Sequence, residues 1–154
     1  MTTILRGDAR ALPLADESVD LICTSPPYFG LRSYTDDGEH YEAQIGAEDS
    51  PALFVDALID CTREMLRVLK PSGSIWVNLG DKYAGAASGP RTPGADGYAR
   101  DREPVQFQQR HEYCADVPAK SLLGIPWRYA IRAVDELGLI LRAEVIWSKP
   151  NGLP

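Results

Sequence analysis

The chain has 154 residues, of which 44% are apolar and 25% charged, and its formal net charge is −6. These values are typical of one globular domain, and no apolar run is long enough to cross a bilayer. The three cysteines are widely spaced, which indicates neither a disulfide framework nor a zinc site. We therefore expect a single domain in a reducing cytoplasm.

The first expected strand is short and lies at residues 3–6, just before Gly7-Asp8. An acidic side chain at the end of a strand can accept a hydrogen bond from a ligand amine. It can equally cap the turn that follows. Both roles for Asp8 stay open at this point.

The next strand is predicted at residues 19–23, and a stiff loop follows it. Val-Asp-Leu-Ile-Cys is mostly apolar, and Ser25-Pro26-Pro27-Tyr28 comes directly after Thr24. Neither proline can donate to a sheet, and both fix their own φ angles. The loop should therefore present a hydroxyl, a carbonyl and an aromatic ring. It lies at the carboxyl end of a strand, which is where ligands bind in open α/β sheets.

Residues 35–49 are polar and acidic, and we interpret them as a solvated loop rather than a metal site. His40 has no partner at a recognisable spacing. Ser50-Pro51 then predicts a helix that runs to about Leu69. Its apolar residues recur at helical spacing and should face a sheet: Leu53, Phe54, Leu58, Cys61, Met65, Leu66 and Leu69.

A third strand is predicted at residues 74–79 and ends at Gly80-Asp81. Asn78 and Asp81 are secondary site candidates, although strand-end Asn and Asp residues often only form turns. Glycine, proline and arginine recur between about 83 and 120, which predicts a long loop insertion.

The last predicted helix has Pro126 in its first turn and is closed by Gly138. A final strand is predicted at residues 139–147, followed by Ser148 to Asn151. The apolar face of the helix should consist of Trp127, Ala130, Ile131, Val134 and Leu137.

The eleven residues 24–34, Thr-Ser-Pro-Pro-Tyr-Phe-Gly-Leu-Arg-Ser-Tyr, resemble the catalytic motif of the amino-group DNA methyltransferases. These enzymes transfer a methyl group from S-adenosylmethionine to N4 of cytosine or N6 of adenine. Residues 125–128, Ile-Pro-Trp-Arg, and residues 146–151, Ile-Trp-Ser-Lys-Pro-Asn, resemble the same family.

The resemblance implies roles for individual residues. The Ser25 hydroxyl and the Pro26 carbonyl would accept hydrogen bonds from the target amine, with Pro27 completing the motif. Tyr28 would stack on a base flipped out of the duplex. Asp8 would lie near the adenine of the cofactor, and methyl transfer requires no metal. The implied substrate-binding residues are Phe29, Arg32, Tyr34, Lys149, Pro150 and Asn151.

The implied fold is α/β, a Rossmann-like S-adenosylmethionine-dependent methyltransferase fold with strand order 3-2-1-4-5-7-6. The predicted strands would be its third to sixth, so strands 1, 2 and 7 and the glycine-rich cofactor loop are not found in this sequence. We therefore expect residues 1–154 to be the amino-terminal catalytic portion of a methyltransferase domain in β-type motif order, with the insertion at about 83–120. A carboxyl-terminal segment or a second polypeptide would complete the cofactor site.

The expected function is site-specific methylation of N4 of a flipped cytosine in double-stranded DNA, as in the restriction-modification systems of bacterial or phage-infected cells. Ser25 favours cytosine, because the adenine enzymes more often carry Asp or Asn there. N6-adenine methylation and a truncated, non-catalytic binding module are the alternatives. Free-standing DNA-binding modules usually carry a basic face, but the net charge here is −6. Either a basic surface forms only in the folded protein or the main DNA-gripping part is absent, and we favour the second.

Overall fold

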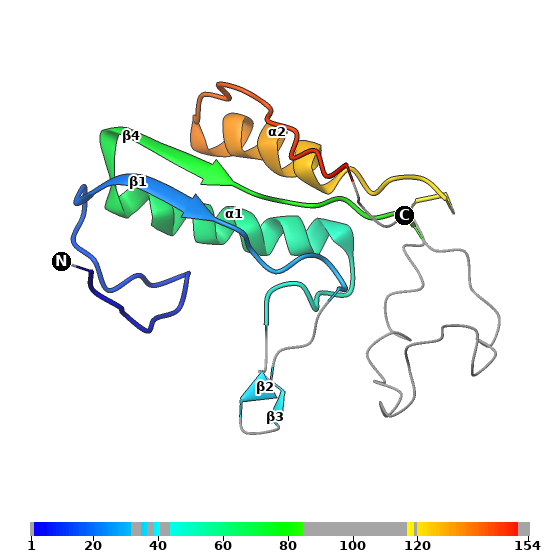
Figure 1. Cartoon of the computed structure of the whole chain (residues 1–154), viewed down its shortest axis with the longest axis horizontal. Coiled ribbons are helices and arrows are strands. Elements are labelled where there is room, and N and C mark those ends of the chain that lie inside the picture. The colour runs from blue at the N-terminus through cyan, green and yellow to red at the C-terminus, as the bar shows by residue number, and fades with distance from the viewer. Residues whose placement is uncertain are drawn as a thin grey trace.

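A computed structural model describes residues 2–31, 44–84, 117–118 and 120–150, together with the backbone of residues 35–36 and 39–40. The elements follow in the order β1 (Val19–Thr24), β2 (Thr35–Asp36), β3 (Glu39–His40), α1 (Pro51–Val68), β4 (Leu69–Val77) and α2 (Ile125–Leu137) (Figure 1). Strands β1 and β4 pair in parallel, and β2 and β3 form a separate two-stranded hairpin. The described part is thus a small α/β unit. Neither of its helices combines the length and apolar content that a membrane crossing requires.

The parallel pairing of β1 and β4 contains an irregularity near its start. The ladder begins with Val19 opposite Leu69 and shifts before it reaches Ser74. Gly73 lies in this shift, where a Cβ atom would be 2.7 Å from the Leu69 side chain and 3.0 Å from the Asp20 carbonyl oxygen. Glycine therefore lets the two backbones approach closely enough for the ladder to continue. Beyond the shift, the carboxyl ends of both strands reach the same edge.

Helix α1 confirms the helix predicted from Ser50-Pro51. The Ser50 hydroxyl accepts a hydrogen bond from the Leu53 amide at 3.2 Å, and Pro51 lies in the first turn. The buried side chains of the helix are Pro51, Phe54, Val55, Leu58, Ile59, Cys61, Thr62 and Val68. Leu53 was expected to face the sheet but is 50% exposed. It lies to one side of the buried stripe that runs through Phe54 and Leu58.

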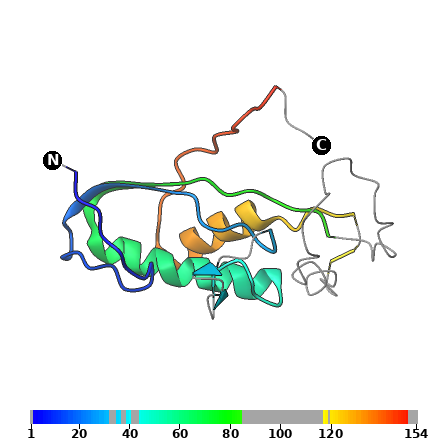
Figure 2. The ribbon, with the colours of Figure 1, turned by 60° about the horizontal axis from the view of Figure 1, so that its bottom comes forward.

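Both helices lie on one side of the β1–β4 pair (Figure 2). Helix α1 contacts β4 and α2, and the shared core includes Phe29, Phe54, Val55, Leu58, Ile59, Leu123, Ile125 and Ala133. The opposite side of the sheet has exposed apolar side chains, because Leu21 is 57% and Trp76 56% exposed. Within the described part of the chain, the core is therefore one-sided.

Helix α2 forms where it was predicted, and Gly138 ends it in the left-handed conformation with φ of 69°. The expected apolar face is wrong in three positions, because Trp127 (51%), Ile131 (58%) and Val134 (37%) are exposed. The buried residues of the helix are instead Ile125 and Ala133. The difference arises because α2 packs against α1 rather than against the sheet.

Two predicted strands are wrong. Residues 3–6 and 139–147 join no sheet within the described ranges. Apart from Leu139, which packs against the core, their large apolar side chains face solvent, as Ile4 at 93% and Ile146 at 82% exposure show. Figure 2 shows the segment after α2 running away from the two helices. An apolar, β-branched sequence favours a strand, but the strand forms only where a neighbour pairs with its backbone groups.

The two flanks of the predicted insertion lie side by side. Tyr83 and Leu122 form an isolated antiparallel bridge. The Ala84 amide donates to the Ser121 carbonyl at 2.7 Å. The chain thus leaves the end of β4 and returns beside it before α2 begins. Residues 85–116 of the insertion lie outside the described residues.

Candidate functional site

The loop Ser25-Pro26-Pro27-Tyr28 continues directly from β1. The ladder extends one step past the strands, because the Asn78 amide donates to the Thr24 carbonyl at 2.8 Å. Neither Pro26 nor Pro27 has an N–H to continue the ladder, so the chain leaves the sheet there. The hydroxyl, the carbonyls and the ring of the loop are therefore placed at the edge where β1 and β4 end together.

Gly46 holds the far side of this loop. Its carbonyl accepts a hydrogen bond from the Gly30 amide at 2.8 Å. Its φ is +97°, and a Cβ atom would lie 3.0 Å from the Tyr28 carbonyl oxygen and 3.3 Å from Pro27 Cβ. A side chain at position 46 would thus be both strained and crowded. The sequence analysis missed this residue, since a glycine in a polar segment gives no indication of the loop that it meets.

A cavity of about 190 Å³ lies between the loop and the two helices. Its walls come from six separate segments of the sequence, and the lining includes Thr24, Ser25, Pro26, Pro27, Leu58, Cys61, Thr62, Met65 and Tyr129. The catalytic candidates and the buried faces of α1 and α2 therefore meet at one place.

The polar groups on the helix side of the cavity are satisfied and neutral. The Thr62 hydroxyl donates to the Leu58 carbonyl at 2.7 Å and lies 2.8 Å from the Tyr129 hydroxyl, which is then the donor in that pair. Burial raises the pKa of Tyr129, and burial likewise raises the pKa of the Cys61 thiol. Thr62 and Tyr129 are 67 positions apart, so sequence spacing gave no means of pairing them.

The loop itself presents acceptors that are not engaged. Ser25 is exposed and lines the cavity, and its hydroxyl makes no hydrogen bond within the described part of the chain. The Pro26 carbonyl likewise accepts none from the described residues. Two adjacent unpaired acceptors at the mouth of a cavity can receive an amino group, because –NH₂ carries two hydrogens.

The two aromatic residues of the motif differ in their surroundings. Tyr28 is half-buried, and its ring lies against Gly80. Phe29 is only 4% exposed; its ring centroid is 5.5 Å from that of Phe54, and the Lys82 ammonium is 5.9 Å from its centroid. Phe29 therefore contributes to the core, whereas Tyr28 keeps part of its surface available to a ligand.

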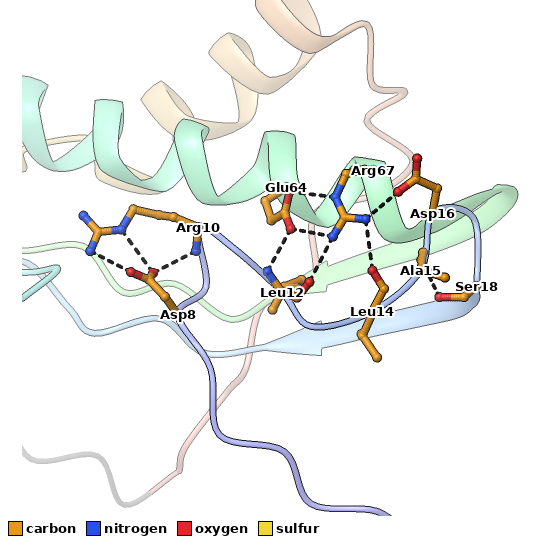
Figure 3. Close-up of polar contacts among 9 residues, drawn as sticks. All are labelled: Asp8, Arg10, Leu12, Leu14, Ala15, Asp16, Ser18, Glu64 and Arg67. Atoms are coloured by element: carbon orange, nitrogen blue, oxygen red, sulfur yellow. Dashed lines mark hydrogen bonds and ion pairs between the residues drawn. The ribbon is translucent and has the colours of Figure 1, made fainter.

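Asp8 forms a tight local turn with Arg10. Its carboxylate accepts hydrogen bonds from the Arg10 amide at 2.9 Å and from the Arg10 Nε and Nη2 at 3.1 and 3.0 Å (Figure 3). The hydrogen bond from the Arg10 guanidinium lowers the pKa of Asp8. Of the two roles left open above, the structure displays turn capping. The contact of Asp8 with the cofactor stays a prediction. The next residue, Ala9, lines the cavity.

Arg67 and Glu64 of α1 tie the segment before β1 to the helix (Figure 3). The Arg67 guanidinium donates to the carbonyls of Leu12 and Leu14 at 3.0 Å each, and it pairs with Glu64 at 2.7 Å. The Glu64 carboxylate in turn accepts from the Leu12 amide at 2.8 Å. This brace fixes where the chain enters β1. An i, i+3 acid–base pair can be found in a sequence, but its backbone partners cannot.

Two of the remaining predicted substrate residues are not brought to the cavity. Lys149 and Pro150 lie in the exposed segment after α2, and neither lines the cavity beside Ser25. Arg32, Tyr34 and Asn151 lie outside the described residues, as does the side chain of His40. Within the described ranges, no three His, Cys, Asp or Glu side chains are grouped so that they could hold a metal ion.

Comparison with known proteins places the chain in a family. A family model described as DNA methylase matches residues 19–154. The Type II methyltransferase M.Cfr9I of Citrobacter freundii is 39% identical over 154 residues, covering 99% of this chain and 48% of its own length. The Type II methyltransferase M.SmaI of Serratia marcescens is 39% identical over 157 residues, which cover 98% of this chain and 49% of the relative.

A third relative, the Type II methyltransferase M.XycI of Xanthomonas campestris pv. cyanopsidis, is 37% identical over 157 residues, with 99% of this chain and 48% of the relative covered. The chain thus spans about half the length of these curated relatives. No solved structure matches it. The family match covers most of the chain and includes the whole Ser25–Tyr28 loop, so the chain belongs to the amino-group (N4/N6) DNA methyltransferase family.

Proposed function

We propose that the protein containing this chain transfers a methyl group from S-adenosylmethionine to the exocyclic amine of a base in double-stranded DNA, with N4 of cytosine as the target. The observation that carries this proposal is the pair of unengaged acceptors, the Ser25 hydroxyl and the Pro26 carbonyl, at the mouth of the cavity.

The chemistry explains why two acceptors are needed. An exocyclic amine is a poor nucleophile, because its lone pair is delocalised into the base ring. Acceptors that face both N–H groups favour a pyramidal nitrogen whose lone pair points towards the methyl donor. Ser25 and Pro26 supply such acceptors from a loop that Gly46 and β4 hold in place. The rate then derives mainly from the positioning of the two reactants.

Tyr28 supports the same proposal. A base inside a duplex is out of reach and must leave the stack, at a cost of a few kcal/mol. Stacking on an aromatic side chain contributes about 1–3 kcal/mol per base. The half-buried ring of Tyr28 lies two positions after Pro26 in the same loop, so a stacked base would have its amine close to Ser25 and Pro26.

The described residues fit only part of a cofactor site. Small-molecule pockets are about 300–1,000 Å³ in volume, whereas this cavity measures about 190 Å³. The Asp8 carboxylate, the predicted cofactor contact, is occupied by Arg10. S-adenosylmethionine would supply an activated methyl on a sulfonium. In this proposal the described residues orient the amine, and residues elsewhere in the protein hold most of the cofactor.

The choice of base rests on Ser25. The family resemblance implies that adenine enzymes more often carry Asp or Asn at this position, so the hydroxyl favours cytosine; N6-adenine methylation is the alternative. A second candidate function is a binding module without catalysis by this chain alone. The small cavity favours it.

Transfer of labelled methyl from S-adenosylmethionine to DNA by the chain, with separation of the product nucleosides, tests the proposal. We expect N4-methylcytosine once the residues that hold the cofactor are present. N6-methyladenine would reassign the base. No transfer, together with no saturable cofactor binding, would favour the binding module. Transfer that appears only when a second polypeptide or a longer chain is added would assign the completed site to that partner.

A further inference from the structure

The ring of Tyr28 lies on the backbone of Gly80, just after β4. A Cβ atom at position 80 would be 2.9 Å from Tyr28 Cε2, 3.1 Å from Cδ2 and 3.4 Å from Cζ. Contacts below 3.0 Å do not occur for real Cβ atoms without a shift of their neighbours. Any side chain at position 80 would therefore displace the Tyr28 ring or the strand end.

Space, and not backbone conformation, accounts for glycine at this position. The described glycines with positive φ are Gly30, Gly46, Gly124 and Gly138, and Gly80 is not among them. Alanine would adopt the backbone conformation of Gly80 without strain. The effect of a substitution at position 80 would thus come from the contact with Tyr28.

Asp81 fixes the segment that carries Gly80. Its carboxylate accepts hydrogen bonds from the Gly124 and Ile125 amides at 3.0 and 3.1 Å, and from the Lys82 amide at 2.9 Å. Gly124 is the N-cap of α2 and has no side chain with which to cap the helix. Asp81 therefore caps α2 from another element, which ties the end of β4 to the start of the helix.

The next residue, Lys82, extends the anchoring. Its carbonyl accepts from the Leu123 amide at 2.9 Å, and its ammonium lies 5.9 Å from the centroid of the Phe29 ring. Phe29 is buried beside Phe54. The segment 80–82 thus contacts both aromatic residues of the catalytic motif and is attached to α2 at the same time.

We propose that Gly80 is a positioning residue that sets the plane of the Tyr28 ring, with Asp81 locking Gly80 in place through the start of α2. The functional part of this inference rests on the proposed function, in which Tyr28 stacks on the flipped base. The contact of the Tyr28 ring with the Gly80 backbone would restrict the orientation of the ring before the base arrives.

The first test observes the ring without reference to activity. The 154-residue chain, with ¹³C-labelled tyrosine rings, is compared by NMR as wild type, Gly80→Ala and Gly138→Ala, and Tyr28→Phe assigns the Tyr28 signal. Gly138→Ala is the control for backbone strain without a new contact, because Gly138 has positive φ and no atom within 4 Å of an added Cβ. We expect the Tyr28 ring signal to move in Gly80→Ala and to stay in Gly138→Ala. An unmoved signal in Gly80→Ala would overturn the proposal.

Asp81→Asn provides a second variant should Gly80→Ala fail to fold. The amide side chain offers one acceptor oxygen instead of two, so at least one of the three hydrogen bonds is lost. The Tyr28 signal should again move, and a spectrum that matches the wild type would contradict the role of Asp81 as the lock.

The second test measures kcat and KM for methyl transfer in the same variants. A misplaced stacking ring should lower kcat by on the order of 10–100-fold in Gly80→Ala, while KM for S-adenosylmethionine stays near the wild-type value. If the wild type methylates DNA and Gly80→Ala leaves kcat unchanged, the positioning proposal fails while the proposed function stands. If the wild type transfers no methyl even with a longer chain or a second polypeptide added, the proposed function fails, and the ring signal still decides whether Gly80 positions Tyr28.

Discussion

The loop at residues 25–28 and the segment at residues 146–150 both resemble motifs of one family, yet their surroundings differ. The loop follows a paired strand and is held by Gly46 and by the end of β4. The second segment is exposed along its length and pairs with no strand within the described residues, and Ile146 is 82% and Trp147 75% exposed. A motif can thus be recognisable in sequence whether or not its surroundings are assembled.

The two sides of the β1–β4 sheet differ in the same way. The helix side of the sheet is packed, with Phe54 at 0% and Ile59 at 1% exposure. The other side and the segment after α2 leave large apolar side chains in solvent. Exposed apolar area of this kind often marks an interaction surface. The proposed site lies on the packed side of the sheet, so the positions of its acceptors depend on the packing of α1 and α2.

The largest expected difference is in stability. Phe54→Ala should lower the free energy of unfolding by about 3–5 kcal/mol, because it leaves a cavity in the core beside Phe29. Ile146→Ala should change it by less than about 0.5 kcal/mol, since the side chain is already in solvent. Urea denaturation of the two variants measures this. Comparable losses would mean that the segment after α2 is packed in solution.

Ser25→Ala tests the packed-side motif directly. Loss of one preorganised hydrogen-bonding group at a reacting centre commonly lowers kcat by about 10²–10³-fold, and we expect a similar loss here with cofactor affinity near normal. Ser74→Ala is the matched control, because Ser74 is exposed on β4 and does not line the cavity. Steady-state methyl transfer by both variants decides the role of Ser25. Equal rates in the two variants would remove Ser25 from the mechanism.

Tyr28→Ala should weaken the capture of the flipped base by about 1–3 kcal/mol, the usual contribution of an aromatic stack. A 2-aminopurine placed at the target position reports stacking through its fluorescence. We expect the wild type to change this fluorescence on binding and the variant to leave it closer to that of the free duplex. The same signal from both proteins would argue against a stack on Tyr28.

The smallest effect concerns the brace before β1. A hydrogen bond from Arg67 lowers the pKa of Glu64 from its ordinary value of 4.5. A depressed folded-state pKa contributes stability that is present above the unfolded value and is lost as the pH falls through the folded value. Wild-type stability should therefore decline below about pH 4.5, and Glu64→Gln should flatten this decline. Thermal unfolding from pH 6 to pH 3 measures it. Identical pH profiles would show that the brace does not form.

Local sequence rules predicted the elements whose determinants are local. The Ser50-Pro51 start of α1, the Gly138 end of α2 and the carboxyl end of β1 were all predicted and are all present. The strand at residues 139–147 could not be decided locally, because its backbone groups need a partner strand that the pattern cannot supply.

The residues of the candidate site likewise divide into those with local determinants and those that depend on distant partners. The Ser25–Tyr28 loop was identified from its residues, as its hydroxyl, carbonyl and ring are encoded in four consecutive positions. Gly46, Thr62, Tyr129 and Asp81 were not assigned their contacts, because each meets a partner that is distant in the sequence. Burial also reversed expectation, since Phe29 lies in the core although it belongs to the motif.

The central claim is that Ser25 and Pro26 accept hydrogen bonds from the target amine. The most direct measurement is a double-mutant cycle between the protein and the base. Wild type and Ser25→Ala are each titrated with a duplex whose target base is cytosine or 2-pyrimidinone, which lacks the amine. We predict a coupling free energy of about 0.5–1.5 kcal/mol, the usual net value of one hydrogen bond. A coupling of zero, with both proteins distinguishing the two duplexes equally, would contradict the account.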